Sequence, residues 1–248
     1  GLGFIVINEI VRHVTHRDVK RLSTHTRTVL TVTAILIVGG AAIIFGLENS
    51  NVATYGRLPF GTRILASWFQ SVTARTAGFD TVAQANLRPA TLMVVILLMF
   101  IGASPGGTGG GVKTTTFAVI LAFVWASLSM ADQTHLGKRG VRDDSVKKAI
   151  VVFTLSLGIV IGATFLLAVM DGHRFPVLHL LFDVTSAFGT VGLSAGITAS
   201  LSAGSQIVLI ATMLAGRVGV LTAMLTLFNP DGHPLRLIRL AEDDVAIG

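Results

Sequence analysis

Two short Thr-x-Gly segments have the residue types that can place a row of backbone carbonyl oxygens around a cation. They are Thr76-Ala77-Gly78-Phe79 and Thr190-Val191-Gly192-Leu193, and they lie 114 residues apart. Glycine permits backbone angles that aim consecutive carbonyls in one direction, and rings of such carbonyls replace the hydration shell of an ion. One such tripeptide would be uninformative, whereas two at corresponding places of a repeat indicate an ion-selective turn. The alternative is a pair of glycine turns that ease tight helix packing.

A glycine-rich segment separates two apolar stretches: Ser104-Pro105-Gly106-Gly107-Thr108-Gly109-Gly110-Gly111. Proline removes a backbone donor and each glycine costs about 1 kcal/mol in a helix, so a helix must open here. Gly106 and Gly111 have the spacing of a phosphate-binding loop, but Val112 puts Lys113 one residue late, so nucleotide binding is not expected. Irregular backbone at membrane depth must line a cavity, which predicts a flexible plug. A broken helix used only for packing is the alternative.

Two basic residues lie inside or next to apolar stretches: Arg217 and Lys113. Arg217 lies inside the apolar stretch Gly204–Phe228, where an arginine costs about 2.5–3.5 kcal/mol to insert. We therefore expect Arg217 to face a pore or to pair with carbonyls, and Lys113 either to do the same or to extend toward the cytoplasm. Arg75 is expected to form a structural hydrogen bond at the back of the short helix rather than to influence the outer mouth of a pore. Asp183 is a weaker candidate, which would form a buried ion pair with Arg75.

The composition is that of a membrane protein. Of 248 residues, 52% are hydrophobic and 13% are charged, with a mean hydropathy of +0.75, whereas soluble domains carry about 25% charged residues. This excludes a disordered chain, a basic nucleic-acid-binding domain and an ordinary soluble enzyme. The chain has no cysteine, and no catalytic triad, carboxylate pair or metal-ligand cluster is recognisable, so neither an enzyme nor a metal or cofactor site is expected. The charge-free stretches long enough to cross a bilayer are Val29–Leu47, Pro89–Val112, Thr114–Ala131 and Ala149–Met170.

The basic residues predict the orientation. Twelve of them lie near residues 11–28, 132–148 and 229–248, whereas four lie near the loops of the other side: Arg57, Arg63, Arg88 and Arg174. Cytoplasmic loops carry the excess of Lys and Arg, so both large basic loops and the C-terminal tail are expected in the cytoplasm. The basic loops themselves are expected to be solvated surfaces facing lipid headgroups.

The same order of elements occurs twice. A spanning helix, a short helix (Leu58–Ala74), a Thr-x-Gly turn and a broken returning helix fill residues 29–131, with the open segment at 103–112. Residues 149–228 repeat this order, with a short helix at Phe175–Ala187. Residues 1–10 are expected to be the end of a preceding returning helix. The predicted fold is all-α and transmembrane: two parallel helix–pore-loop–helix repeats, half of a four-repeat potassium-channel-like pore.

The chain resembles the Trk/Ktr/HKT potassium-transport superfamily, most closely its KtrB branch. The resemblance covers the whole chain, as repeats three and four of four. It is carried by Ala74-Arg75-Thr76-Ala77-Gly78-Phe79, by Phe188-Gly189-Thr190-Val191-Gly192-Leu193-Ser194, by the segment from Gly102 to Thr114 and by Gly1-Leu2-Gly3-Phe4.

The resemblance implies a potassium uptake subunit in a bacterial plasma membrane, with Gly78 and Gly192 as filter glycines and 104–111 as an intramembrane gate loop. It implies K⁺ as the transported ion, with Na⁺ admitted in some relatives, and Arg217 as an arginine below the filter that bonds the closed gate loop. It also implies a homodimer in the lipid bilayer, regulated by a cytosolic nucleotide-binding ring of KtrA or TrkA type, with no nucleic-acid partner.

Two other classes remain as alternatives. An alternating-access secondary transporter with broken helices would need inverted repeats and acidic residues at the midplane. Here the expected repeats are parallel, and no acidic residue lies inside a full spanning stretch. A non-conducting assembly subunit would not need two filter-like turns.

Overall fold

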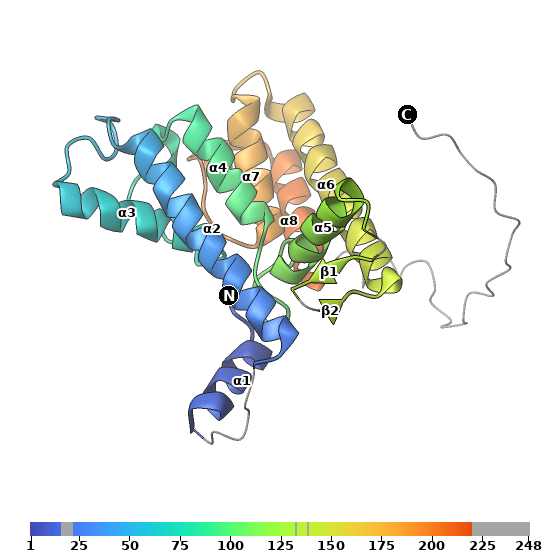
Figure 1. Cartoon of the computed structure of the whole chain (residues 1–248). Helices are drawn as coiled ribbons and strands as arrows, with labels where there is room; N and C mark the ends of the chain where they lie inside the picture. Colours follow the sequence, from blue (N-terminus) through green and yellow to red (C-terminus); the bar gives the residue numbers. More distant parts are fainter. Residues whose placement is uncertain (16–21, 132, 138, 220–248) are drawn as a thin grey trace, which may run out of the picture.

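The computed structural model describes residues 1–15, 22–131, 133–137 and 139–219, and its regular secondary structure is almost entirely helical. Figure 1 shows the order of the elements along the chain. The helices are α1 (Phe4–Thr15), α2 (Thr24–Glu48), α3 (Phe60–Thr73), α4 (Pro89–Phe100), α5 (Thr114–Leu128), α6 (Asp143–Asp171), α7 (Val177–Gly189) and α8 (Ala203–Val218). Two 3₁₀ turns, η1 (Gln84–Asn86) and η2 (Thr198–Ser200), and a two-residue hairpin of β1 (His135–Leu136) and β2 (Arg139–Gly140) complete the described part.

The helices begin and end at other residues than the sequence patterns predict. The loop expected at 11–28 is helical as far as Thr15 and again from Thr24, and the loop expected at 132–148 holds the hairpin and the first turn of α6. The two short helices occupy 60–73 and 177–189 rather than 58–74 and 175–187. Residues 220–248, with the expected end of the last crossing and the C-terminal tail, lie outside the described residues, as do Arg17, Lys20, Arg21 and Lys138.

Two helices are long and apolar enough to cross a membrane. At about 1.5 Å per residue, the 25 residues of α2 and the 29 residues of α6 exceed the roughly 30 Å hydrocarbon thickness. Their apolar side chains largely face outward: only 22% and 28% of the most apolar window of each is buried. A core helix of a soluble protein would bury that face, so these surfaces suit lipid.

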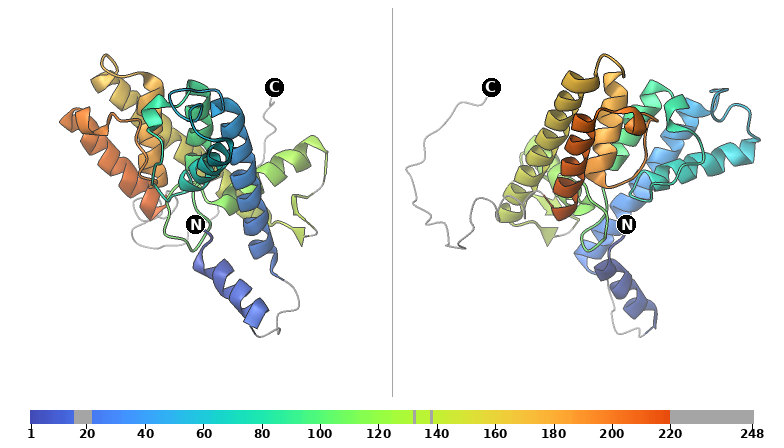
Figure 2. Two further views of the ribbon diagram at one scale, coloured as in Figure 1. Left: turned by 90° about the vertical axis from the view of Figure 1, so that its left-hand side faces the viewer. Right: turned by 180° about the vertical axis from the view of Figure 1, so that it is seen from behind.

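Helices α2, α3 and α4 form one unit and α6, α7 and α8 form another, and α4 packs against α7 to join them. The views of Figures 1 and 2 agree on this side-by-side arrangement. One apolar core gathers around Tyr55, Leu92, Met99 and Phe182, and a second gathers around Phe100, Leu167, Leu180 and Phe188. Because both cores include residues of α4 and of α7, the two units share their packing.

An offset of 114 residues relates the two units in detail. It places η1 on η2, and the first residue of α4, Pro89, on the first residue of α8, Ala203. It also pairs Thr76 with Thr190 and Gly78 with Gly192, and all four residues have positive φ. The two units therefore share this offset from the Thr-x-Gly segment to the start of α4 or α8, whereas the ends of α2 and α6 are 123 residues apart.

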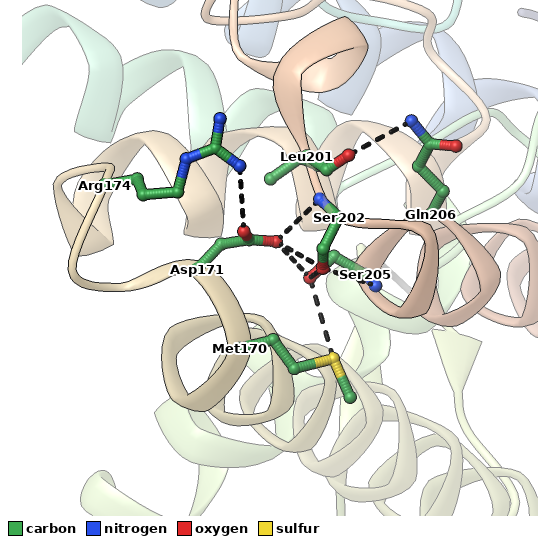
Figure 3. Close-up of polar contacts among 7 residues, drawn as sticks. All are labelled: Met170, Asp171, Arg174, Leu201, Ser202, Ser205 and Gln206. Carbon is green, nitrogen blue, oxygen red and sulfur yellow. Dashed lines mark hydrogen bonds and ion pairs between the residues drawn. The ribbon is translucent and has the colours of Figure 1, made fainter.

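A buried carboxylate holds the start of each returning helix. Asp171, at the end of α6, accepts from the backbone N–H of Ser202 at 3.0 Å and from the hydroxyl of Ser205 at 2.7 Å, as Figure 3 shows. Ser202 is the N-cap of α8 and also donates its hydroxyl to Asp171. A negative charge at a helix N-terminus is favourable because it meets free N–H groups. We call this arrangement a helix-start clamp: a carboxylate that accepts from the N-cap N–H and from the hydroxyl three residues later.

Glu48 forms the equivalent clamp in the first unit. It ends α2, is fully buried, and accepts from the N–H of Arg88 at 2.9 Å and from the hydroxyl of Thr91 at 2.5 Å. Thr54 and Asn51 donate to its second oxygen at 2.5 and 2.7 Å. Four donors therefore surround this buried carboxylate.

A third clamp lies nearer the surface. Glu9 of α1 accepts from the N–H of Ser23, the N-cap of α2, and from the hydroxyl of Thr26. The same geometry thus connects α1 to α2, α2 to α4 and α6 to α8.

We expect Glu48→Ala to lower the thermal midpoint of the full-length protein in detergent by several degrees. Its buried donors would lose their acceptor, at a cost of about 1–3 kcal/mol for each unsatisfied group. Glu9→Ala is the matched control, since it removes the same clamp where water can replace the acceptor, and it should cost clearly less. Equal losses for the two variants in a thermal shift assay would contradict the role given to burial.

Candidate ion-binding site

The two Thr-x-Gly segments begin where the short helices end. Helix α3 ends at Thr73 and α7 ends at Gly189, and both segments then turn through left-handed backbone. Thr76 has φ 70° and Thr190 has φ 52°, a conformation that costs a threonine about 1–3 kcal/mol and persists only where the surroundings enforce it. Each segment thus lies beyond the negative C-terminal end of a helix.

The N–H groups of both segments point back to their own helices. Ala77 and Gly78 donate to the carbonyl of Thr73 at 3.1 and 3.3 Å. In the second segment, Val191 donates to the carbonyl of Ser186 at 2.9 Å, and Gly192 donates to its hydroxyl at 3.2 Å.

The carbonyl oxygens of the two segments are left without donors. Among the described residues, no hydrogen bond ends on the carbonyl oxygens of Thr76, Ala77, Gly78, Thr190, Val191 or Gly192. The N–H groups of Ala77, Gly78, Thr190, Val191 and Gly192 therefore have acceptors, whereas these carbonyls of both segments have no donors in the described part of the chain. This is the arrangement that coordinates a cation through backbone oxygens.

The two segments face each other at their glycines. A Cβ on Gly78 would collide with the carbonyl oxygen of Val191, whereas a Cβ on Gly192 would lie 3.7 Å from the Cα of Gly78. Gly78 has φ 79° and Gly192 has φ 100°. The structure thus brings together residues that are more than a hundred positions apart in the chain.

The flanking residues Phe79 and Leu193 lie in different surroundings. Phe79 is exposed, and its carbonyl accepts from the hydroxyl of Thr73 at 2.5 Å. Leu193 is buried in the core around Tyr55. Only one of these two side chains is therefore part of the packing.

Asp183 braces the second segment, so the expected pairing of Asp183 with Arg75 is wrong. Asp183 accepts from the N–H of Ala195 at 2.8 Å and from the hydroxyls of Ser194 and Thr198 at 2.9 and 2.5 Å. Within the described ranges the ion pair found is Arg174 with Asp171. Three local donors satisfy Asp183 without a cation.

A buried amide pair braces the first segment, and the sequence patterns did not indicate it. Gln70 of α3 and Gln84 of η1 exchange hydrogen bonds of 2.7 and 3.2 Å between their side-chain amides. The repeat offset is the signal that could have indicated Gln84. It places Gln84 on Thr198, which donates to Asp183 in the second unit.

The glycine-rich loop runs from Ile101 to Lys113, between α4 and α5. Its two ends are held together, because Ile101 and Val112 form a parallel bridge and the hydroxyl of Thr114 donates to that of Ser104 at 2.9 Å. The helix opens at the segment where Ser104-Pro105 and the glycines predict a break.

The loop lies directly against both threonines of the segments. Gly110 donates its N–H to the hydroxyl of Thr190 at 2.8 Å. A Cβ on Gly109 would lie 2.6 Å from the hydroxyl oxygen of Thr76. We refer to residues 101–113, the whole connection that contains the expected gate loop 104–111, as the gate loop, after the role proposed below.

The other side of the gate loop meets the N-terminal segment. Ser104 donates its N–H to the carbonyl of Gly1 at 2.9 Å, and Phe4 donates to the carbonyl of Gly106 at 3.1 Å. Figures 1 and 2 show the N-terminus beside the loop that joins α4 to α5. The start of α1 is thus bonded to the gate loop.

The three cations occupy distinct positions. Lys113 donates its Nζ to the carbonyl of Gly109 at 2.5 Å, and buried Arg75 donates to the carbonyl of Gly102 at 3.3 Å. Arg217 lines a cavity of about 570 Å³ together with residues 190–194 of the second segment and residues of α8. The hydrogen bond expected from Arg217 to the loop is not formed within the described part of the chain.

Among the described residues, no group of three or more His, Asp or Glu side chains is arranged to hold a metal ion.

A family model described as a cation transport protein, TrkH, matches residues 21–233. The chain belongs to the TrkH family of cation transport proteins. Its fold is all-α and transmembrane, and the family consists of membrane transport proteins rather than enzymes, as the sequence predicted.

The similar proteins are Ktr and Trk transport proteins. The chain is 38% identical to the Ktr system potassium uptake protein B of Vibrio alginolyticus over 248 residues, which are 100% of this chain and 53% of that protein. It is 36% identical to the protein of the same name from Bacillus subtilis, over 95% of this chain and 52% of that one. The potassium/sodium uptake protein NtpJ of Enterococcus hirae is 33% identical over 100% of this chain and 54% of its own length. The chain thus spans about half the length of these relatives.

The fold is also that of a solved transporter. The crystal structure of the potassium transporter TrkH from Vibrio parahaemolyticus superposes with a TM-score of 0.71 at 18% sequence identity, over 92% of this chain and 49% of that chain. This likeness concerns the fold.

We expect Gly110→Ala to displace the gate loop. Its Cβ would lie 2.9 Å from the carbonyl oxygen of Phe188 and 3.0 Å from that of Gly216, both backbone atoms that cannot rotate away. Ser104, which is fully buried, serves as the reporter: in a Ser104→Cys background without other cysteines, Gly110→Ala should raise the rate of thiol modification severalfold.

Gly39→Ala is the control, because nothing lies within 4 Å of its Cβ position. Equal modification rates for Gly110→Ala and Gly39→Ala in the full-length protein would contradict the close seating of the loop.

Proposed function

We propose that this chain forms half of the pore of a bacterial potassium uptake subunit. The observation that carries the proposal is the set of unbonded carbonyls at Thr76–Gly78 and Thr190–Gly192, on two segments that follow short helices and meet at their glycines. Dehydrating a potassium ion requires oxygens already in place, and carbonyls aimed by bonds made elsewhere provide them without reorganisation. The names of the relatives, potassium uptake and potassium/sodium uptake proteins, support the same ion.

The remaining coordination would come from two further segments in the preceding part of such a protein. The two units here run in the same direction and share the offset of 114 residues from the Thr-x-Gly segment to the returning helix, so an axis along the membrane normal would relate four of them. Residues 1–10 are the end of the second unit in this scheme, and their bonds to the gate loop suit that place.

The gate loop would close the conduction path below the filter. Gly109 and Gly110 lie against the two filter threonines, so an ion leaving the filter meets the loop first. Lys113 adds a positive charge to the loop and Arg217 adds one to the cavity wall, which lowers cation occupancy there.

The orientation of the chain in the membrane is inferred from the uneven distribution of its basic residues, since one end of the helices has few of them. Arg63 donates to carbonyls of Asn49, Gly56 and Leu58, while Arg88 and Arg174 adjoin the clamps of Glu48 and Asp171. We place this end outside and the basic ends, including Arg139 and Arg142, in the cytoplasm. A homodimer and a cytosolic nucleotide-binding ring complete the proposed assembly.

We expect Gly192→Ser to weaken the preference of the full-length protein for K⁺ over Na⁺. A serine has room at this position, since its nearest neighbour, the Cα of Gly78, lies 3.7 Å from the Cβ site, but the φ of 100° would be strained and the carbonyls would turn. The measurement is uptake of rubidium and of sodium into liposomes.

Gly196→Ser is the matched control. It has φ 86° and a nearest neighbour at 3.7 Å, but it lies beyond the second segment. A change of selectivity in Gly196→Ser equal to that in Gly192→Ser would count against Gly192 as a filter residue, as would no change in either.

We expect deletion of 106–111 to increase flux. The deletion removes the backbone that lies beneath both threonines and spares the bridge of Ile101 with Val112. Rubidium uptake by the reconstituted protein should rise at an unchanged ratio of rubidium to sodium. A deletion variant that inserts normally and takes up rubidium at the original rate would remove the gate assignment.

A further inference from the structure

Arg75 is a buried cation whose hydrogen-bonding capacity is mostly unused. It directly precedes the first filter segment and is 8% exposed. One guanidinium nitrogen, Nη2, donates to the carbonyl of Gly102 at 3.3 Å, and the other, Nη1, is buried with no partner. A buried, incompletely bonded charge is costly to fold.

No carboxylate among the described residues compensates Arg75. Asp183 is occupied by Ala195, Ser194 and Thr198, and Asp171 lies at the far end of α6 with Arg174. Arg75 therefore acts through backbone carbonyls rather than through an ion pair.

The carbonyl that accepts from Arg75 is that of Gly102, at the start of the gate loop. A Cβ on Gly102 would collide with the carbonyl oxygen of Gly110, so these two glycines touch across the loop. Gly110 in turn donates to Thr190 of the second filter segment. Besides its bonds to the N-terminal segment, the loop is thus bonded to Arg75, which precedes the first filter segment, and to Thr190, in the second.

We propose that Arg75 is a positioning residue for gating: it latches the gate loop against the filter through the carbonyl of Gly102. The proposal rests on the function proposed above. The latch is one bond of 3.3 Å, slightly longer than the usual range of about 2.7–3.2 Å for N–H···O bonds, so it can release without unfolding α3 or α4. Its strength sets how often the loop leaves the filter, whereas the filter carbonyls set which ion passes.

The test uses the full-length protein with Ser104→Cys as the only cysteine, and it compares Arg75→Gln with Arg75→Lys. Glutamine removes the charge, whereas lysine keeps the charge and offers a single-point donor on a compact head. We expect Arg75→Gln to raise the rate of thiol modification at position 104 at least threefold and to raise rubidium uptake at an unchanged rubidium-to-sodium ratio. Arg75→Lys should lie between Arg75→Gln and the unsubstituted protein.

Arg174→Gln is the matched control, an arginine on the outer side with a half-exposed side chain, and it should leave the modification rate unchanged. If Arg75→Gln does not reach the membrane, Arg75→Lys decides alone: a raised rate supports the latch and an unchanged rate overturns it. A folded Arg75→Gln with an unchanged rate, or with altered selectivity and no change in rate, also overturns it. Thiol modification does not depend on transport, so absence of uptake by the unsubstituted protein would count against the proposed function and not against the latch.

Discussion

Backbone packs directly on backbone around the proposed pore, and the rest of the structure depends on this contact. Gly78 meets the carbonyl of Val191, Gly102 meets that of Gly110 and Gly216 meets that of Phe188, each without space for a Cβ. The contact of Gly78 with Val191 joins the two units, whereas the other two contacts lie within the gate loop and within the second unit. Gly102 and Gly110 show the same close contact within the gate loop, where a residue with a Cβ would collide with backbone.

Irregular backbone within a membrane has a second requirement. Its N–H and C=O groups must form hydrogen bonds inside the protein, because lipid offers none. The filter segments donate to their own helices. The gate loop is held by its bridge and by Thr190. The returning helices are held by the clamps of Glu48 and Asp171. The carbonyls at Thr76–Gly78 and Thr190–Gly192 accept no hydrogen bond among the described residues. Backbone coordination of a cation requires carbonyl oxygens that are free in this way.

Much of this architecture could be predicted from local patterns. Charge-free stretches located α2 and α6, and the repeat offset paired the two Thr-x-Gly segments. Ser104-Pro105 and the following glycines located the break between α4 and α5 because proline and glycine act on the helix in which they occur.

Contacts between distant residues could not be predicted in the same way. Glu48 and Asp171 read as ordinary polar residues at the end of an apolar stretch, since their partners lie some 30 to 43 positions further along the chain. The Asp183–Arg75 pairing was wrong because opposite charge was the only criterion that the sequence offered, whereas local hydroxyl and amide donors satisfy Asp183. The hydrogen bond from Arg75 ends on the backbone carbonyl of Gly102. Every residue has such a carbonyl, so the sequence does not indicate which one is the acceptor.

The central claim is that backbone carbonyls of both segments bind the transported ion, and diffraction from crystals of the full-length protein soaked in rubidium tests it most directly. Our account predicts an anomalous peak between the segments, within coordination distance of carbonyl oxygens at Thr76–Gly78 and Thr190–Gly192. A crystal in which rubidium occupies a site formed by carboxylates, with no peak between Gly78 and Gly192, would contradict it.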